Sequence, residues 1–171
     1  MFAENKICEA CVKGKQTRSS FMPKKQVTSS RTLELLHMDL CGPLKVQNIT
    51  GKKYIWVIVD DYSRYTWTRF LKSKAEKYEE LVVIFKMIQT KLNQVICSIR
   101  SDHGTEFENS KLDKLYMENG MSHNFSAPRT PQQNGVVERK NRFLVNIART
   151  MIIESNLPQN FWAEAVNTCV S

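Results

Sequence analysis

Three β-rich segments in close succession constrain the fold of this chain most. Residues 33–43, 53–59 and 65–71 are rich in Leu, Ile, Val, Trp and Tyr, and short turn-forming stretches separate them. Such runs are typical of strands bounded by turns. Gly42-Pro43 ends the first segment and Asp60-Asp61 ends the second, after which the third returns as a hairpin. We therefore expect the domain to open with three antiparallel strands.

The rest of the chain alternates between helical and strand patterns. Residues 73–93, with Ser73 as the expected cap, predict a helix with one apolar face. A short strand ending at Asp102, a helix over 109–120, an edge strand over 121–125, a long helix over 131–155 and a last helix from Gln159 follow. The order βββαβαβαα predicts an α/β fold with a five-stranded mixed sheet flanked by helices. The apolar face of the first helix comprises Tyr78, Leu81, Val82, Phe85, Ile88 and Leu92.

Length and composition favour one main domain with a small appendage. The chain has 171 residues, of which 42% are hydrophobic, and no apolar run is long enough to cross a membrane. Its N-terminus lacks the apolar segment of a secretory signal. Five cysteines are an odd number, and most lie in apolar segments, so we expect free thiols and an intracellular, reducing compartment.

The charge balance indicates a polyanionic partner. Lys and Arg number 25 against 17 Asp and Glu, which gives a net charge of +8 at pH 7. A basic surface of this kind attracts nucleic acid, although a basic protein can also simply be soluble. The motifs must distinguish these two interpretations.

Residues 1–31 form the expected appendage and a basic linker. Cys8 and Cys11 have the C-x2-C spacing of half a tetrahedral zinc site. No second cysteine pair exists, and the three histidines all lie in the following domain. The pair is therefore either a remnant of a zinc module whose other ligands lie upstream, or two free thiols. Zinc is expected only if upstream ligands exist.

Three acids stand out in the main domain. Asp39 lies inside an apolar strand, where an isolated charge is too costly to keep without a partner or a metal. Asp102 follows a strand, and Glu138 lies in a helix next to Arg139 and Lys140, with 35 residues between the two acids. Each has an ordinary explanation by itself: a partnered strand acid, a turn residue, and a helical ion pair with Arg142.

Taken together, these acids resemble the D,D-35-E signature of retroviral-type integrases. The segments 59–64, 100–107 and 130–139 are similar to the integrase core of copia-type long-terminal-repeat retrotransposons. The resemblance covers residues 32–171 and implies a ribonuclease-H-like fold. The last helix reaches Ser171 without a capping signal, so we expect the native chain to continue.

The resemblance also implies a chemistry. Asp39, Asp102 and Glu138 would hold two Mg²⁺ or Mn²⁺ ions, which suit hard oxygen ligands. The expected reactions are 3′-end processing of element DNA and strand transfer into target DNA. Members of this family act as multimers on DNA, and their integration takes place in the nucleus.

Further residues are expected to contact DNA. The resemblance implies that a loop before the catalytic helix, with Gln132, Gln133 and Asn134, faces element DNA. Basic residues along that helix fit a surface that follows the phosphate backbone: Arg139, Lys140, Arg142 and Arg149.

Several other residues are better explained by structure than by function. A hairpin turn explains Asp60 and Asp61, and His103 is expected to close a turn rather than to bind DNA. Trp56, Trp67 and Trp162 lie inside elements and are expected in the core. Two other functions are open: a domesticated copy that holds DNA without cutting it, and a ribonuclease H or cut-and-paste transposase. The 35-residue interval and the segment around Glu138 favour the integrase.

Overall fold

The computed structural model describes residues 9–14, 29–102, 110–125 and 131–170. A single five-stranded sheet has the order β3-β2-β1-β4-β5. Strands β1, β2 and β3 pair antiparallel, whereas β4 pairs parallel to both β1 and β5. The predicted mixed sheet and its three antiparallel opening strands are therefore confirmed. The strands are β1 (Leu35–Cys41), β2 (Tyr54–Asp60), β3 (Thr66–Leu71), β4 (Ser98–Ser101) and β5 (Ser122–Phe125).

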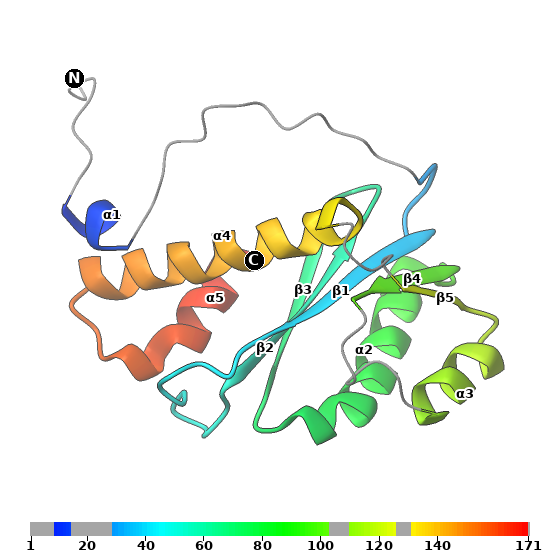
Figure 1. Cartoon of the computed structure of the whole chain (residues 1–171), viewed down its shortest axis with the longest axis horizontal. Coiled ribbons are helices and arrows are strands. Elements are labelled where there is room, and N and C mark those ends of the chain that lie inside the picture. The colour runs from blue at the N-terminus through cyan, green and yellow to red at the C-terminus, as the bar shows by residue number, and fades with distance from the viewer. Residues whose placement is uncertain (1–8, 15–28, 103–109, 126–130, 171) are drawn as a thin grey trace.

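Helices cover both faces of the sheet (Figure 1). Helices α2 and α3 pack on one face, and α4 and α5 pack on the other. A short helix α1 contacts α4, and 3₁₀ turns precede α2 and α5. The helices are α1 (Glu9–Lys13), α2 (Lys77–Leu92), α3 (Ser110–Glu118), α4 (Pro131–Glu154) and α5 (Trp162–Val170).

The alternation of side chains along β1 decides what lies on each face. Leu36 and Met38 belong to the core beneath α2 and α3. Successive strand residues point to opposite faces, so His37 and Asp39 point to the face that α4 crosses. The neighbouring strand β2 supplies Val57 and Val59 to the core under α4 and α5. Strand β1 thus carries an acid on the face covered by the long helix.

Three details of the predicted elements are wrong. Ser73 precedes a 3₁₀ turn and makes no capping side-chain bond, while Glu76 accepts a bond from the Lys72 N–H at 2.9 Å. The buried face of α2 includes Ile84, whereas Val82 and Leu92 are exposed. The face of α2 that contacts the sheet is therefore rotated from the one that the sequence predicted. Residues 132–134 lie in the first turn of α4 rather than in a loop, since Pro is well suited to the first helical position.

The acids that end β2 form a fully buried turn. Asp60 accepts bonds from the N–H and hydroxyl of Ser63, which closes the hairpin as predicted, and from the N–H of Leu33 at 2.9 Å. Asp61 accepts from the N–H and hydroxyl of Ser29 at 3.1 and 2.9 Å, and it contacts His37 Nε2 at 3.0 Å. The two carboxylates therefore tie residues 29–33 to the end of the sheet, beyond their role in the turn.

The tryptophans and cysteines also match expectation. Trp56 is fully buried, Trp162 is nearly so, and Trp67 packs against the core from the edge strand β3. Cys41, Cys97 and Cys169 are free thiols. Within the described ranges, no helix is both long and apolar enough to span a membrane.

Candidate active site

Asp39 is held in a defined orientation on the α4 face of β1. Its Oδ1 accepts the N–H of Leu40 at 2.9 Å, and its Oδ2 accepts the side-chain N–H of Asn141 at 2.6 Å. Asn141 lies on α4, 102 residues further along the chain. Both oxygens of this carboxylate therefore have a donor, and the remaining lone pairs are free for another ligand.

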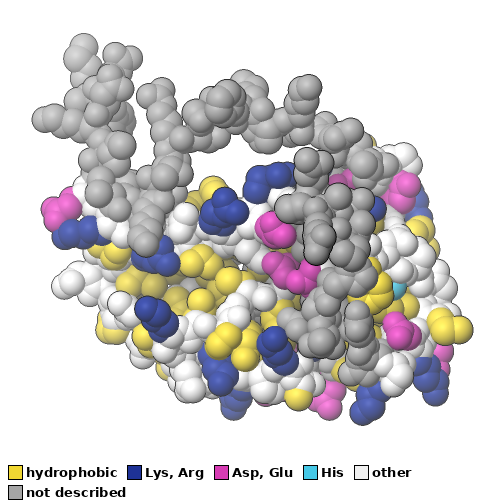
Figure 2. Space-filling model, viewed as in Figure 1, with side chains coloured by type: hydrophobic (Ala, Val, Ile, Leu, Met, Phe, Trp, Pro, Cys, Tyr) yellow, Lys and Arg dark blue, Asp and Glu magenta, His cyan; other side chains and the backbone are white. Residues whose placement is uncertain are grey.

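The structure brings the negative charges of the three predicted acids together. Burial, the charge of Asp102 and the charge of Glu138 together raise the pKa of Asp39 to about 6, against the opposing hydrogen bonds from Leu40 and Asn141. Asp102 follows directly after β4, which pairs with β1, and Glu138 lies on α4 one turn before Asn141. Acidic side chains gather near the centre of the face shown in Figure 2, beside the first half of α4.

The chemistry of this cluster fits a hard divalent cation. Asp39 is half-buried among like charges, an arrangement that costs free energy until a cation neutralises it. Carboxylate oxygens are the ligands that Mg²⁺ and Mn²⁺ prefer. Among the described residues, no three His, Cys, Asp or Glu side chains are spaced to hold a metal ion as they stand. Carboxylates that repel one another favour such a wider spacing, and the exposed Glu138 side chain is free to reorient.

Asn141 is a site residue that the sequence argument missed. It is 8% exposed and occupies a position in the buried stripe of α4 between Val137 and Leu144. Its Oδ1 is buried and has no hydrogen-bond partner in the described part of the chain. The sequence does contain a signal for this role, because Asn141 is polar at a position where the period of the helix predicts an apolar residue. The stripe alone does not reveal that its partner is Asp39.

We expect Asn141→Ala to weaken the site without unfolding the protein. The substitution leaves Asp39 Oδ2 without its donor, so the carboxylate loses its orientation, and loss of a residue that supports a metal ligand typically costs about 10- to 100-fold in metal affinity or activity. Mn²⁺ titration followed by calorimetry measures the effect. The Asn146→Ala change at a half-buried position of the same helix is the control, and equal affinities for the two variants would contradict the role of Asn141.

The basic residues of α4 point in several directions. Arg139 and Arg142 are exposed near Glu138, which suits contact with a phosphate backbone. Lys140 lies over the ring of Phe143 at 5.4 Å. Burial raises the pKa of Cys169 on α5, and the charge of Lys140 partly offsets this rise. Lys140 therefore faces α5 rather than the acids. The predicted DNA contacts of these basic residues stay predictions.

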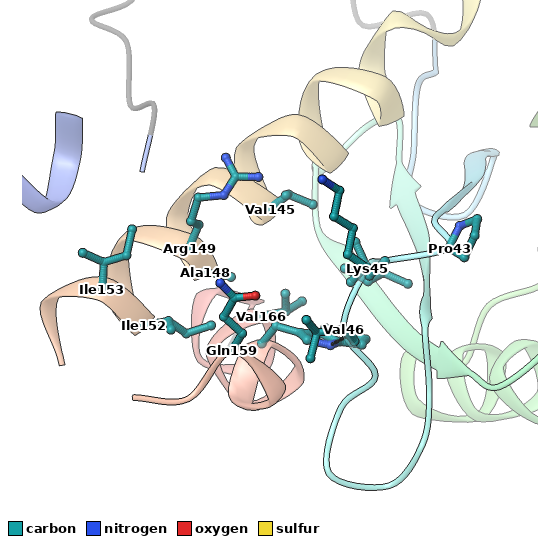
Figure 3. Close-up of a pocket in the computed structure, with 13 residues that line it drawn as sticks. Pro43, Lys45, Val46, Val145, Ala148, Arg149, Ile152, Ile153, Gln159 and Val166 are labelled. Carbon is teal, nitrogen blue, oxygen red and sulfur yellow. Dashed lines mark hydrogen bonds between the residues drawn. The ribbon is translucent and has the colours of Figure 1, made fainter. Parts of the chain in front are cut away.

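Arg149 lies apart from the acids, at an apolar pocket between α4, α5 and the loop after β1 (Figure 3). The pocket has a volume of about 490 Å³ and is lined mainly by aliphatic side chains. Lys45 and Arg149 extend along the same side of it in Figure 3. Trp162 lines it too, and its ring N–H donates to the Val46 carbonyl at 3.0 Å.

Other predicted residues fall partly or wholly outside the described residues. Cys8 and His103 lie there entirely. Cys11 is described only as part of α1, and Gln132, Gln133 and Asn134 only as part of α4. The zinc half-site and the DNA contacts of these amides stay predictions.

Comparison with known proteins supplies an independent view of the chain. Residues 29–131 match the integrase core domain family. The Retrovirus-related Pol polyprotein from transposon TNT 1-94 of Nicotiana tabacum is 35% identical over 166 residues, which cover 95% of this chain and 12% of that protein. The corresponding polyprotein from transposon RE2 of Arabidopsis thaliana is 29% identical over 163 residues, or 95% of this chain and 11% of that protein. The chain thus spans 12% or less of the length of these relatives.

Solved structures agree on the fold. The HTLV-2 integrase catalytic core domain in complex with magnesium, in a trimeric form, superposes with a TM-score of 0.58 and 19% identity, covering 80% of this chain and 82% of that one. Its dimeric form gives a TM-score of 0.57. With its five-stranded mixed sheet and flanking helices, the chain has the ribonuclease-H-like fold of integrase catalytic cores. It belongs to the integrase core domain family.

Proposed function

We propose that this chain is the catalytic core of a retrotransposon integrase, which processes the 3′ ends of element DNA and joins them to target DNA. The observation that carries the proposal is the electrostatic coupling of Asp39 to Asp102 and Glu138 on one face of the sheet. Relatives that contain this segment are transposon Pol polyproteins, and a solved structural neighbour is an integrase core in complex with magnesium.

Asp39, Asp102 and Glu138 would hold the divalent cations. Such ions, when bound, activate the attacking oxygen and stabilise the leaving oxygen of an in-line displacement at phosphorus. Asn141 keeps the Asp39 carboxylate in one orientation through its 2.6 Å bond. In the first reaction, a water oxygen bonds to phosphorus and the bond between phosphorus and the 3′ oxygen of the retained strand breaks. The phosphate leaves with the departing nucleotides, and the retained strand keeps a 3′ hydroxyl. In the second, that hydroxyl attacks a target phosphate and displaces a 3′ oxygen of the target.

The exposed Arg139 and Arg142 next to Glu138 support DNA as the partner. Their guanidinium groups suit phosphate oxygens, and the net charge of +8 favours association with a polyanion. The dimeric and trimeric forms of the HTLV-2 core support self-association as part of the proposal.

A plasmid-nicking assay with Mn²⁺ tests the proposed function. We expect the wild-type chain to convert supercoiled plasmid to the nicked form and Glu138→Gln to be inactive, because the amide cannot supply the same charge to a cation. Asp113→Asn, which removes an exposed acid on α3, serves as the control. If the chain binds plasmid but does not nick it at any Mn²⁺ concentration, it is a DNA-binding remnant and the proposal fails.

A further inference from the structure

Arg100 is placed beside the acids by the alternation of β4. Ile99 and Ser101 point into the core under α2 and α3, where Ile99 packs and the Ser101 hydroxyl bonds with His123 at 2.9 Å. Arg100 and Asp102 therefore point to the opposite face, which is the face of Asp39. The pairing of β4 with β1 sets Arg100 directly beside His37.

Among the residues that the structure describes, none neutralises the Arg100 guanidinium. Within the described ranges, no hydrogen bond or ion pair engages it, and it is half-buried. The charges that raise the pKa of Asp39 are those of Asp102 and Glu138. A half-buried arginine without a carboxylate partner retains its full capacity for an incoming anion.

Its neighbours on the same sheet face do not compete for that anion. Burial lowers the pKa of His37, the hydrogen bond and charge of Asp61 oppose this, and the nearby charge of Arg100 adds to the lowering, which favours the neutral imidazole. On the other side, β5 aligns Asn124 with Arg100, and this exposed amide can donate an additional hydrogen bond. A positive charge with an amide beside it is suited to a phosphate.

The distance between Arg100 and Asp102 along β4 relates Arg100 to the acids. Residues two apart on a strand lie about 6.6 Å from one another. That separation is similar to the distance between consecutive phosphates along one DNA strand. If the proposed function holds, a phosphate next to the reacting one reaches Arg100 while the reacting phosphate lies at the carboxylates.

We propose that Arg100, with Asn124 beside it, forms a subsite for the backbone phosphate of DNA that neighbours the reacting phosphate. This subsite rests on the proposed function for its role in catalysis but not for its capacity to bind DNA. The subsite fixes the position of the DNA strand along β4 and does not discriminate between base sequences.

The test compares Arg100→Gln with Lys86→Gln. Both remove one positive charge, and Lys86 is exposed on α2, on the other face of the sheet. A labelled 20-base-pair DNA duplex is titrated with the whole chain in EDTA over a range of salt concentrations. We expect Arg100→Gln to lower the affinity by roughly 10-fold and the slope of log affinity against log salt by about 0.9, as for one lost phosphate contact. Lys86→Gln should change the affinity less than about 2-fold.

A second variant and a second measurement distinguish loss of a phosphate contact from damage to the fold or to the acidic site. Arg100→Lys keeps the charge but loses the planar fork, so it should keep the salt slope and lose only part of the affinity. Thermal unfolding with and without Mg²⁺ must show the same metal-induced shift for wild type and Arg100→Gln. Equal DNA binding by Arg100→Gln and Lys86→Gln would overturn the subsite. Loss of the Mg²⁺-induced shift in Arg100→Gln would overturn it too, because Arg100 would then act by supporting the acids.

The binding measurement separates this inference from the proposed function. If the wild-type chain never nicks DNA, the integrase proposal fails, yet the difference between the two Gln variants in EDTA still decides whether the subsite exists. If the chain nicks DNA and the two variants bind alike, the proposed function stands and the subsite is wrong.

Discussion

Asp39→Asn is expected to stabilise the metal-free protein at pH 7.5 while abolishing its response to divalent cations. Burial and the neighbouring acids raise the pKa of Asp39 from 3.8 to about 6, which corresponds to a destabilisation of at most about 3 kcal/mol when the carboxylate is charged. An asparagine removes this charge. Its Oδ1 can still accept the Leu40 N–H, and a flipped Asn141 amide can offer its unpartnered Oδ1 to the new side-chain N–H.

The pH dependence of this effect has a defined sign. An acid whose pKa is raised by folding favours the folded state at low pH, and that contribution is lost as the pH rises through the folded-state value near 6. The stability advantage of Asp39→Asn should therefore be largest above pH 6 and fall to about half at pH 5. Urea unfolding in EDTA at both pH values measures it.

The metal response gives the second half of this prediction. A cation that binds only the folded state at about 100 times its Kd stabilises it by roughly 2.7 kcal/mol. We expect Mg²⁺ or Mn²⁺ to raise the unfolding temperature of the wild type and not that of Asp39→Asn. Asp113→Asn, the control, should shift stability by less than about 0.5 kcal/mol and keep the metal response. The account would be wrong if the cations stabilised wild type and Asp39→Asn equally.

Asp61→Ala is expected to cost about 3 kcal/mol of folding free energy, because at least four donors from the described residues converge on this one buried carboxylate. These are the N–H and hydroxyl of Ser29, the ring N–H of His37, and the guanidinium of Arg64 at 3.3 Å. Without Asp61 these donors lose their shared acceptor in a buried site. The segment at Ser29 would also lose its attachment to the sheet.

Urea unfolding monitored by tryptophan fluorescence measures this loss. Glu118→Ala removes an acid from an exposed ion pair with Lys114, whose atoms are 3.8 Å apart, and should cost less than about 0.5 kcal/mol. Asp61→Asn retains one acceptor oxygen and should fall between the two. A cost below about 1 kcal/mol for Asp61→Ala would show that the buried network does not stabilise the fold as described.

Local sequence patterns were sufficient to predict the sheet and the helix order. Strands β1 to β3 alternate between core residues such as Met38 and residues of the α4 face, and a period of two identifies a strand from its own sequence. The pairing of β4 next to β1 follows from the parallel crossover through α2. The proximity of Asp39 to Asp102 is then a consequence of topology.

Contacts between distant segments could not be predicted in this way. The bond between Asn141 and Asp39 joins residues far apart in the chain, and no local pattern encodes which residue of α4 faces β1. The hydrogen bonds of Asp61 could not be predicted either, because its turn is local in sequence but its partners Ser29 and His37 are distant. The rotated face of α2, with Ile84 buried in place of Val82, likewise depends on how the helix sits on a twisted sheet.

Calorimetric titration of the chain with Mn²⁺ at pH 7.5 tests most directly whether the three acids form a cation site. The test variant combines Asp39→Ala, Asp102→Ala and Glu138→Ala, and the control combines alanine substitutions of the exposed acids Asp113, Glu118 and Glu154, which changes the net charge equally. We expect the control to bind Mn²⁺ like the wild type and the test variant to bind at least about 10-fold more weakly. Equal Mn²⁺ affinity in the test variant and the wild type would contradict the cation site, and with it the proposed chemistry.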